Sequence, residues 1–403
     1  MEFSLKQKLF YFFPVIFCFC LPFGSRITSV IIALWTFLSF FNINFDQFKR
    51  GLAHRNLLTL VFFFLLTLIS AFLSDNKQEG LFGVEVKLSL LLFPYLFFCF
   101  QWPVQILKRC VVGFVSGCFF ASIYLIGRAF FYSLNGHPEF FFYTLFSDLI
   151  HASYFAMYLL LAIIVVVLFY DKWFKDQKSV VYSSYFFVGI FVVSIFLCSS
   201  KLGIISFFCS MPLLLLYKWR ALMNFRKLMF ILFSGLLIVI VFYGLFPDSF
   251  NRLSSLTSIP EKIDKTSTES TAVRVLIWQE SIELIQNNLL FGTGVGDVND
   301  DLYKAYEANG LTGAYKHKLN AHNQFFQTFL GMGIVGFVML LLITVGQLIK
   351  GILKRHFLLF IFSLVIVLNF LVESMLQTAA GVLFFSFFYC LFNLVNEEAL
   401  LSE

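Results

Sequence analysis

Charged residues are scarce in this sequence. They make up 13% of the 403 residues, whereas 60% are hydrophobic and 59 are phenylalanine. A soluble globular domain carries roughly 25% charged residues. Because a chain this apolar cannot cover itself with polar surface, lipid must act as its solvent. The composition therefore excludes a water-soluble globular protein and predicts a membrane protein.

The apolar segments also lack the alternation that is typical of membrane β-strands. Such strands alternate apolar and polar residues over ~10 positions, but these runs stay apolar for ~17–25 residues, the length that a helix needs to cross a bilayer. We predict an all-α membrane protein with about 12 transmembrane helices. One large loop, on the periplasmic or exterior side, would contain short amphipathic helices. The expected spans are 9–24, 27–41, 56–73, 84–100, 111–133, 151–170, 180–199, 202–217, 228–246, 325–346, 357–372 and 376–395.

Patterns for disulfides and for metal binding are missing as well. All eight cysteines lie in or beside apolar runs, so neither a disulfide framework nor a zinc site can be built from them. The sequence has no Asp-x-Asp motif and no carboxylate cluster, which a nucleotide sugar held by a divalent cation would require. We therefore expect no metal and no cofactor, and we do not expect nucleic acid as a partner.

The few basic residues are distributed unevenly between alternate loops. With the N-terminus inside, seventeen Lys and Arg residues fall in cytoplasmic segments and four fall in or beside the short outside segments. The seventeen are Lys6, Lys8, Lys49, Arg50, Arg55, Lys108, Arg109, Lys172, Lys175, Lys178, Lys218, Arg220, Arg226, Lys227, Lys350, Lys354 and Arg355, and the four are Arg26, Lys77, Lys87 and Lys201. Since cytoplasmic loops carry the basic excess, both termini are predicted to be cytoplasmic. The chain would then consist of helices 1–9 (residues 1–246), an extracytoplasmic loop (247–324), and helices 10–12 with a short tail (325–403).

The long polar loop is expected to contain two helices. Ser270 or Thr271 can cap a helix that runs to about Leu290, and a second short helix is expected within 299–318. An apolar stripe on the first helix would lie along the membrane interface, with Trp278 at headgroup depth. The stripe comprises Val275, Trp278, Ile282, Ile285 and Leu289.

A glycine-rich run, GTGVG at residues 292–296, follows the first expected helix. No strand precedes it and no Lys-Ser/Thr pair follows it, so it does not fit a phosphate-binding loop. We interpret it as a helix cap and turn, with contact to a ligand as the alternative.

Two residues of this loop are the strongest candidates for chemistry. His322 stands where the chain becomes apolar again, and an imidazole at this boundary can take a proton from a sugar hydroxyl. Arg274, at the start of the first loop helix, presents a fork of donors that matches phosphate oxygens. The alternatives are an interfacial histidine without a task and a surface arginine that binds lipid headgroups.

Cations near the outer ends of spans form a second group of candidates. Lys201 lies between two apolar runs, where an isolated cation needs water or an anion such as a diphosphate; snorkelling to the interface is the alternative. Arg128, in the outer third of the fifth span, needs a carboxylate, a carbonyl or a ligand phosphate. Four further residues are possible substrate-binding groups: His151, Asn323, Lys318 and Glu373.

The run from Thr271 to Gly336 has a layout that resembles a known family. An Arg-x3-Trp element is followed by GTGVG and then by AHNQFFQTFLGMGIVG, which contains His322 and Asn323. This is similar to the signature region of the O-antigen ligase and O-antigen polymerase superfamily of membrane glycosyltransferases. SKLG, which contains Lys201, and LIHASYFAMY, which contains His151, are also similar to that family.

The resemblance implies a function and a location. It implies transfer of a glycan from an undecaprenyl-diphosphate carrier to an acceptor, with lipid A–core as the first expectation, on the periplasmic face of the bacterial inner membrane. The transfer would need no metal and would invert the anomeric centre. By the match to the family, His322 is the general base and Arg274 binds the donor diphosphate, with Lys201 where family members often have arginine.

Other functions remain open at this point. The same donor chemistry would serve a polymerase that extends the glycan on its carrier, or an enzyme that transfers glycan to a protein. A transporter is the alternative of a different class, although the halves of the chain show no repeat and no paired broken helices near mid-membrane.

Overall fold

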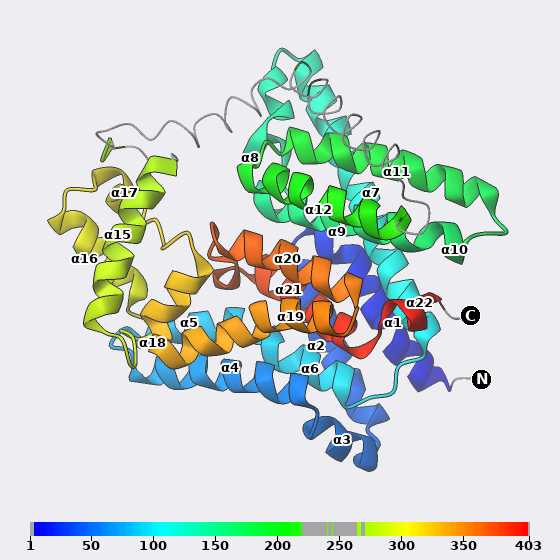
Figure 1. Cartoon of the computed structure of the whole chain (residues 1–403), viewed down its shortest axis with the longest axis horizontal. Helices are drawn as coiled ribbons and strands as arrows, with labels where there is room; N and C mark the ends of the chain where they lie inside the picture. The colour runs from blue at the N-terminus through cyan, green and yellow to red at the C-terminus, as the bar shows by residue number, and fades with distance from the viewer. Residues whose placement is uncertain (1–3, 220–239, 241–243, 245–263, 267–270, 402–403) are drawn as a thin grey trace. The chain divides into compact units, whose positions relative to one another are not determined.

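The computed structural model describes residues 4–219, 240, 244, 264–266 and 271–401, and it contains helices and no strands within these ranges (Figure 1). Nine helical segments of the described chain are long and apolar enough to cross a membrane, and two shorter apolar helices follow them. These segments correspond to eleven of the expected spans. The remaining expected span, 228–246, lies almost wholly outside the described residues, so the count of about 12 stays a prediction.

The helices group into two compact units. The first unit comprises Met1–Asn42, Pro103–Ser254 and Glu397–Glu403. Its helix α9 (Ala152–Val165) contains no charged residue and is buried along its whole length, as expected for a helix that is apolar on every side. The helices of the first unit are α1 (Leu5–Cys20), α2 (Ser25–Ser39), α7 (Val104–Leu134), α8 (Tyr143–Phe146), α9 (Ala152–Val165), α10 (Asp171–Trp173), α11 (Lys178–Leu197), α12 (Lys201–Trp219) and α22 (Glu397–Leu401).

The second unit comprises Ile43–Trp102 and Ser255–Asn396, and it contains most of the predicted polar loop. It combines apolar helices with a small polar subdomain formed by α15, α16 and α17. Its helices are α3 (Phe45–Leu52), α4 (Arg55–Leu73), α5 (Lys77–Val86), α6 (Ser89–Phe98), α15 (Thr271–Asn287), α16 (Val298–Ala308), α17 (Thr312–Lys316), α18 (Gln324–Ile343), α19 (Val345–Leu353), α20 (Phe357–Phe370) and α21 (Ala379–Leu394).

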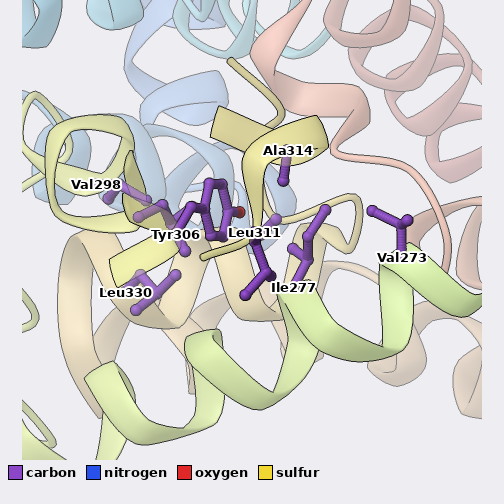
Figure 2. Packing of buried hydrophobic residues seen from close by; sticks show 9 residues of the cluster. Val273, Ile277, Val298, Tyr306, Leu311, Ala314 and Leu330 are labelled. Atoms are coloured by element: carbon purple, nitrogen blue, oxygen red, sulfur yellow. The ribbon is translucent and has the colours of Figure 1, made fainter. Parts of the chain in front are cut away.

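The polar subdomain has its own hydrophobic core (Figure 2). Val273 and Ile277 of α15 pack against Leu302 and Tyr306 of α16 and against residues around α17. Burial raises the pKa of the Tyr306 hydroxyl. The first expected helix is therefore present, and the second expected helix is present as two short helices that are separated at Gly310 (φ 69°).

The apolar stripe expected on α15 is divided between two environments. Trp278 and Ile285 pack against the core of the subdomain, whereas Ile282 and Leu289 are exposed together with Leu290 and Phe291. The sequence predicted one continuous stripe because the apolar residues of both faces recur at helical spacing. The exposed face at the end of α15 suits contact with a membrane surface, which stays a prediction.

The glycine-rich run fastens the subdomain to two membrane helices. Gly292 (φ 71°) follows α15 and lies so close to α18 that a Cβ would come within 2.3 Å of the Leu330 carbonyl oxygen. Opposite it, Gly333 interrupts α18 with φ 60°, a conformation that favours glycine. The expected role as cap and turn is consistent with this geometry, in which the glycines allow close backbone contact.

Gly296, the last residue of the glycine-rich run, and Asp297 bind the segment at the C-terminal end of α4. The Gly296 N–H donates to Ser74 Oγ at 3.0 Å, and the Asp297 carboxylate accepts the backbone N–H groups of Asp75 at 2.8 Å and Asn76 at 2.7 Å. Carboxylate–amide bonds of this kind are stronger than neutral ones. The subdomain is thereby held in a fixed position against the helices of its own unit.

Candidate functional site

His322 has an unusual backbone conformation. Its φ is 44°, in the left-handed region that non-glycine residues seldom adopt. Three hydrogen bonds hold the surrounding chain: Asn320 Oδ1 accepts the His322 N–H at 2.9 Å, Gln327 Oε1 accepts the Ala321 N–H at 3.1 Å, and Trp278 Nε1 donates to the Ala321 carbonyl at 3.0 Å. Strain that is held in place by several contacts is a frequent feature of functional sites.

Asn323 caps the start of α18 and also anchors a neighbouring turn. Its Oδ1 accepts the Phe326 N–H at 3.1 Å, which caps the helix, and its Nδ2 donates to the Leu371 carbonyl at 3.0 Å. The next residue, Gln324, accepts the Leu376 N–H at 2.7 Å. Asn323 therefore has a structural role, and these bonds tie the histidine segment to the turn at 371–376.

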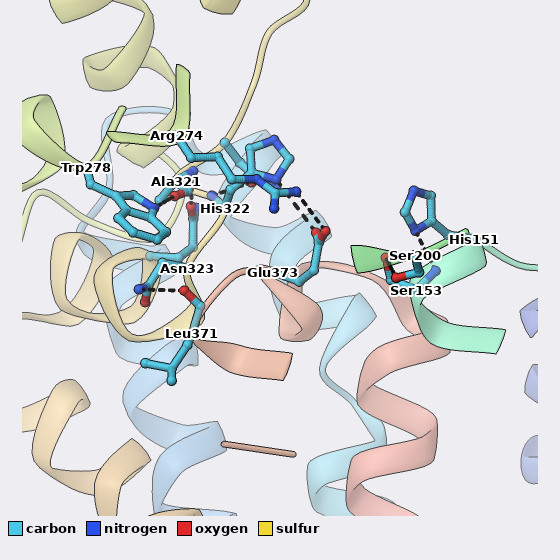
Figure 3. Close-up of polar contacts among 12 residues, drawn as sticks. His151, Ser153, Ser200, Arg274, Trp278, Ala321, His322, Asn323, Leu371 and Glu373 are labelled. Carbon is cyan, nitrogen blue, oxygen red and sulfur yellow. Dashed lines mark hydrogen bonds and ion pairs between the residues drawn. The ribbon is translucent and has the colours of Figure 1, made fainter. Parts of the chain in front are cut away.

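This turn carries Glu373, whose carboxylate lies between Arg274 and His322 (Figure 3). Arg274 Nη2 donates to Oε1 at 3.1 Å, and His322 Nδ1 lies 3.6 Å from Oε2. The side chains of Arg274, His322 and Glu373 are 28%, 24% and 14% exposed. The structure thus brings together three residues from separate parts of the chain in one partly open cluster.

The cluster has the parts that acid–base chemistry on a phosphate-linked substrate requires. A carboxylate beside one imidazole nitrogen fixes the orientation of the ring and stabilises the imidazolium that forms when the other nitrogen takes a proton. The distance from His322 Nδ1 to Glu373 is slightly longer than a hydrogen bond, and such contacts often tighten when substrate binds. Arg274 uses Nη2 for Glu373, and a guanidinium has five N–H donors, so donors remain for an anion.

Two other expected site residues, His151 and Lys201, lie at one end of the first unit. His151 caps α9 by accepting the Ser153 N–H at 3.4 Å, and Lys201 is the first residue of α12. The two helix starts are joined by a hydrogen bond from Ser200 Oγ to Ser153 Oγ at 3.1 Å. Positive helix ends meet there, which favours an anion, and the role of both residues in binding stays a prediction.

Arg128 finds its partners within the first unit. Its Nη1 lies 2.6 Å from Asp148 Oδ2, and its Nη2 donates to the carbonyls of Leu145 and Phe146. The protein itself therefore supplies the carboxylate and carbonyl partners that the sequence analysis expected Arg128 to need. Its assignment as a diphosphate ligand gains no support from these contacts and stays a prediction.

Lys318 differs from the clustered residues because its side chain is exposed. Its backbone is in the left-handed region, with φ 47°, and its carbonyl accepts the Tyr303 hydroxyl at 3.0 Å. The described contacts thus give its backbone a structural role. A part in substrate binding stays a prediction.

Sequence reasoning did not connect Glu373 with Arg274 and His322. It placed Glu373 among the possible substrate-binding groups, because a carboxylate at a helix end gives no local sign of its partners. The supporting roles of Gln327 and Trp278 were missed as well. Within the described ranges, no group of three or more His, Cys, Asp or Glu residues is arranged to hold a metal ion.

Fold and cluster together define a multi-pass helical membrane protein with a polar site beside an apolar helix. Residues 186–341 match the model of the family described as O-antigen ligase. The match confirms the resemblance seen in the sequence, and it indicates a membrane enzyme of the O-antigen ligase and polymerase type of glycosyltransferase. No curated protein matches the chain. The matched segment includes Arg274 and His322, whereas Glu373 lies beyond it.

Proposed function

We propose that this protein is a glycosyltransferase that moves a glycan from an undecaprenyl-diphosphate carrier to lipid A–core on the periplasmic face of the bacterial inner membrane. The observation that carries the proposal is the placement of Arg274 and His322 on the two oxygens of one carboxylate, Glu373. The family match over residues 186–341 supports the general reaction class.

The geometry supports a single displacement. His322 takes the proton of the acceptor hydroxyl at the ring nitrogen that faces away from Glu373, and the acceptor oxygen forms a bond to the anomeric carbon. The bond from that carbon to the donor phosphate breaks, and its electron pair stays on the lipid diphosphate. Arg274 donates hydrogen bonds to the charge that develops there. Attack opposite the leaving group inverts the anomeric centre, and no metal takes part.

Lys201, His151, Arg128 and Lys318 are secondary parts of the proposal. Lys201 and Arg128 would contribute positive charge to the donor diphosphate, and His151 and Lys318 would contribute to substrate binding. A lysine offers a point charge without the two-pronged fork of arginine. Arg128 is the weakest of the four because Asp148 already neutralises it.

The direct test is transfer of a lipid-linked glycan by purified protein. His322→Ala should lower the rate by a factor on the order of 10² to 10⁴, because general-base catalysis is lost. The matched control is His317→Ala, since His317 is exposed and belongs to the same segment. We expect the control to stay within about two-fold of wild type, as is usual for surface changes. Equal rates for the two variants would contradict the assignment.

The acceptor distinguishes this proposal from a polymerase or a protein-directed transferase. Cells that lack a ligase lose all long glycan from lipid A–core but keep it on the carrier. Cells that lack a polymerase instead show a single repeat unit on lipid A–core. Loss of glycan from a protein alone would indicate the third possibility.

A further inference from the structure

The second unit contains a cavity of about 780 Å³ at the end of the α4–α18 pair that lies away from His322. The end of α3, the start of α4 and the α18–α19 junction form its walls. Three cations, Arg50, Arg55 and Lys350, line it together with His54 and Gln347, and none of the described Asp or Glu residues does. We call this cavity the basic pocket.

The cations of the basic pocket lack carboxylate partners in the described part of the chain. Arg50 Nε donates to the Asp46 carbonyl at 3.3 Å, and Lys350 Nζ donates to Asn393 Oδ1. Both acceptors are neutral, so no carboxylate among the described residues compensates the positive charge. Three cations around one cavity repel each other unless an anion or water screens them.

The start of α4 adds to this positive potential. His54 precedes the helix and makes no side-chain cap, so the free N–H groups of the first turn begin at the wall of the pocket. The His54 ring stacks on Phe98 at 4.2 Å, and its Nδ1 is buried without a described hydrogen-bond partner. Burial and the nearby charge of Lys350 lower the pKa of His54. The pocket therefore favours negative charge for several independent reasons.

The basic pocket is separate from the cluster of His322. Helix α18 runs from Gln324, two residues after His322, to Ile343, and its 20 residues, which are kinked at Gly333, extend for at most about 30 Å. The pocket lies at the far end of α18, where Leu342 lines it, in segments that the charge pattern assigns to the cytoplasmic side. Leu342, Ile349 and Ile352, in and beside the wall, expose apolar side chains that suit acyl chains.

We propose that the basic pocket binds a phosphate-bearing anion, with the headgroup of an anionic phospholipid of the cytoplasmic leaflet as its occupant. Free phosphate or diphosphate offers the same chemistry from the aqueous phase. Arg50, Arg55 and Lys350 hold the phosphate, the first turn of α4 donates N–H groups, and the exposed leucine and isoleucines contact the chains. This site does not depend on the proposed glycan transfer.

Native mass spectrometry of the full chain in mild detergent tests the proposal. The probes are phosphatidylglycerol, phosphatidylcholine with the same acyl chains, and inorganic pyrophosphate. The variants are Arg55→Gln, Lys350→Gln and the double variant. The matched control is Lys354→Gln, because Lys354 is exposed near Lys350 and does not line the pocket.

We expect phosphatidylglycerol to be retained in preference to phosphatidylcholine. The double variant should bind it at least about ten-fold more weakly, since each basic residue near anionic lipid contributes measurably, and Lys354→Gln should bind as wild type does. Pyrophosphate that binds with the same dependence on Arg55 and Lys350 would support the same site with an aqueous source.

Three results would overturn the proposal. One is equal retention of the two lipids together with no binding of pyrophosphate. Another is unchanged affinity in the double variant, and the third is an equal loss in Lys354→Gln. If the double variant does not fold, the affinities of Arg55→Gln and Arg55→Lys for phosphatidylglycerol are compared instead. The lysine keeps the positive charge, so only the glutamine should weaken binding.

Discussion

Glu373 contacts both Arg274 and His322, two residues that local sequence patterns identified separately and did not connect. It is 99 residues from Arg274 in the chain, yet their side chains meet at 3.1 Å. A carboxylate between an imidazole and a guanidinium can orient both groups. In the proposed mechanism Glu373 is therefore a positioning residue, while His322 and Arg274 meet the substrate.

Glu373→Gln tests whether the negative charge of the Glu373 side chain, rather than its size, is needed for transfer. The amide keeps the size of the side chain but no longer stabilises the imidazolium, and we expect transfer to fall by about 10²-fold or more, by analogy with the loss of carboxylates that hold a catalytic histidine. Adding Glu373→Gln to His322→Ala should lower the rate of transfer little further, because the carboxylate acts through the imidazole that His322→Ala removes. The exposed Glu307→Gln is the matched control. Losses that multiply in the double variant would show that the two residues act separately.

Lys87 is a buried cation outside this cluster. It is 3% exposed and donates only to neutral oxygens, Gly83 O at 3.4 Å and Gln377 Oε1 at 3.3 Å, in the described chain. A charge removed from water without a counter-ion is costly. We expect Lys87→Met to raise the thermal unfolding temperature, with the exposed Lys178→Met as a neutral control. A lower unfolding temperature in Lys87→Met would show that the ammonium contributes to stability.

At the scale of elements, the kink in α18 determines how the polar subdomain attaches to the membrane helices. The Ile334 N–H donates to the Leu289 carbonyl at 2.9 Å, and the Thr293 N–H donates to the Leu330 carbonyl at 2.7 Å. These bonds cross from α18 to the chain that follows α15. They are possible because Gly333 turns the backbone away from the helical path.

Gly333→Ala should therefore destabilise the protein. An added Cβ would come within 2.2 Å of the Leu290 carbonyl oxygen, and the positive φ is unfavourable for alanine. We expect a loss of at least about 2 kcal/mol, seen as a lower unfolding temperature in detergent. Gly127→Ala in α7 is the control, because a Cβ there meets nothing within 4 Å. An unfolding temperature of Gly333→Ala equal to that of the wild type would contradict the role of the kink.

The sequence predicted the elements better than their contacts. The apolar spans could be located because lipid imposes a length and a composition on each of them. The helix at α15 and the boundary position of His322 followed from local patterns in the same way. The pairing of Arg274 with Glu373 and the clamp of Asp297 on the end of α4 depend on residues far apart in the chain, and no local pattern encodes them.

At the scale of the whole molecule, exposed apolar residues mark surfaces that suit lipid. On α4, the exposed stripe consists of Leu58, Phe62, Leu65, Ile69 and Phe72. The opposite face of the same helix is buried, at Leu60, Phe63 and Thr67 among others. A helix that packs against protein on one face and contacts lipid on the other has apolar residues on both faces, as α4 has. The end of α15 exposes Phe291 at 81%, which suits the membrane surface.

The proposed chemistry requires that the segment before His322 lies outside the cytoplasm. Lys316 closes α17 and is exposed, so a cysteine there can react without disturbing the cluster. Lys354 is exposed in a segment expected on the other side of the membrane. Each substitution is made singly, and the unsubstituted chain gives the background from the eight native cysteines.

The most direct measurement is labelling of these variants in spheroplasts with a membrane-impermeant maleimide. We expect Lys316→Cys to react in intact spheroplasts, and Lys354→Cys to react only after lysis. If Lys316→Cys is protected until lysis, His322 faces the cytoplasm, and transfer of a glycan on the periplasmic face cannot occur at this site.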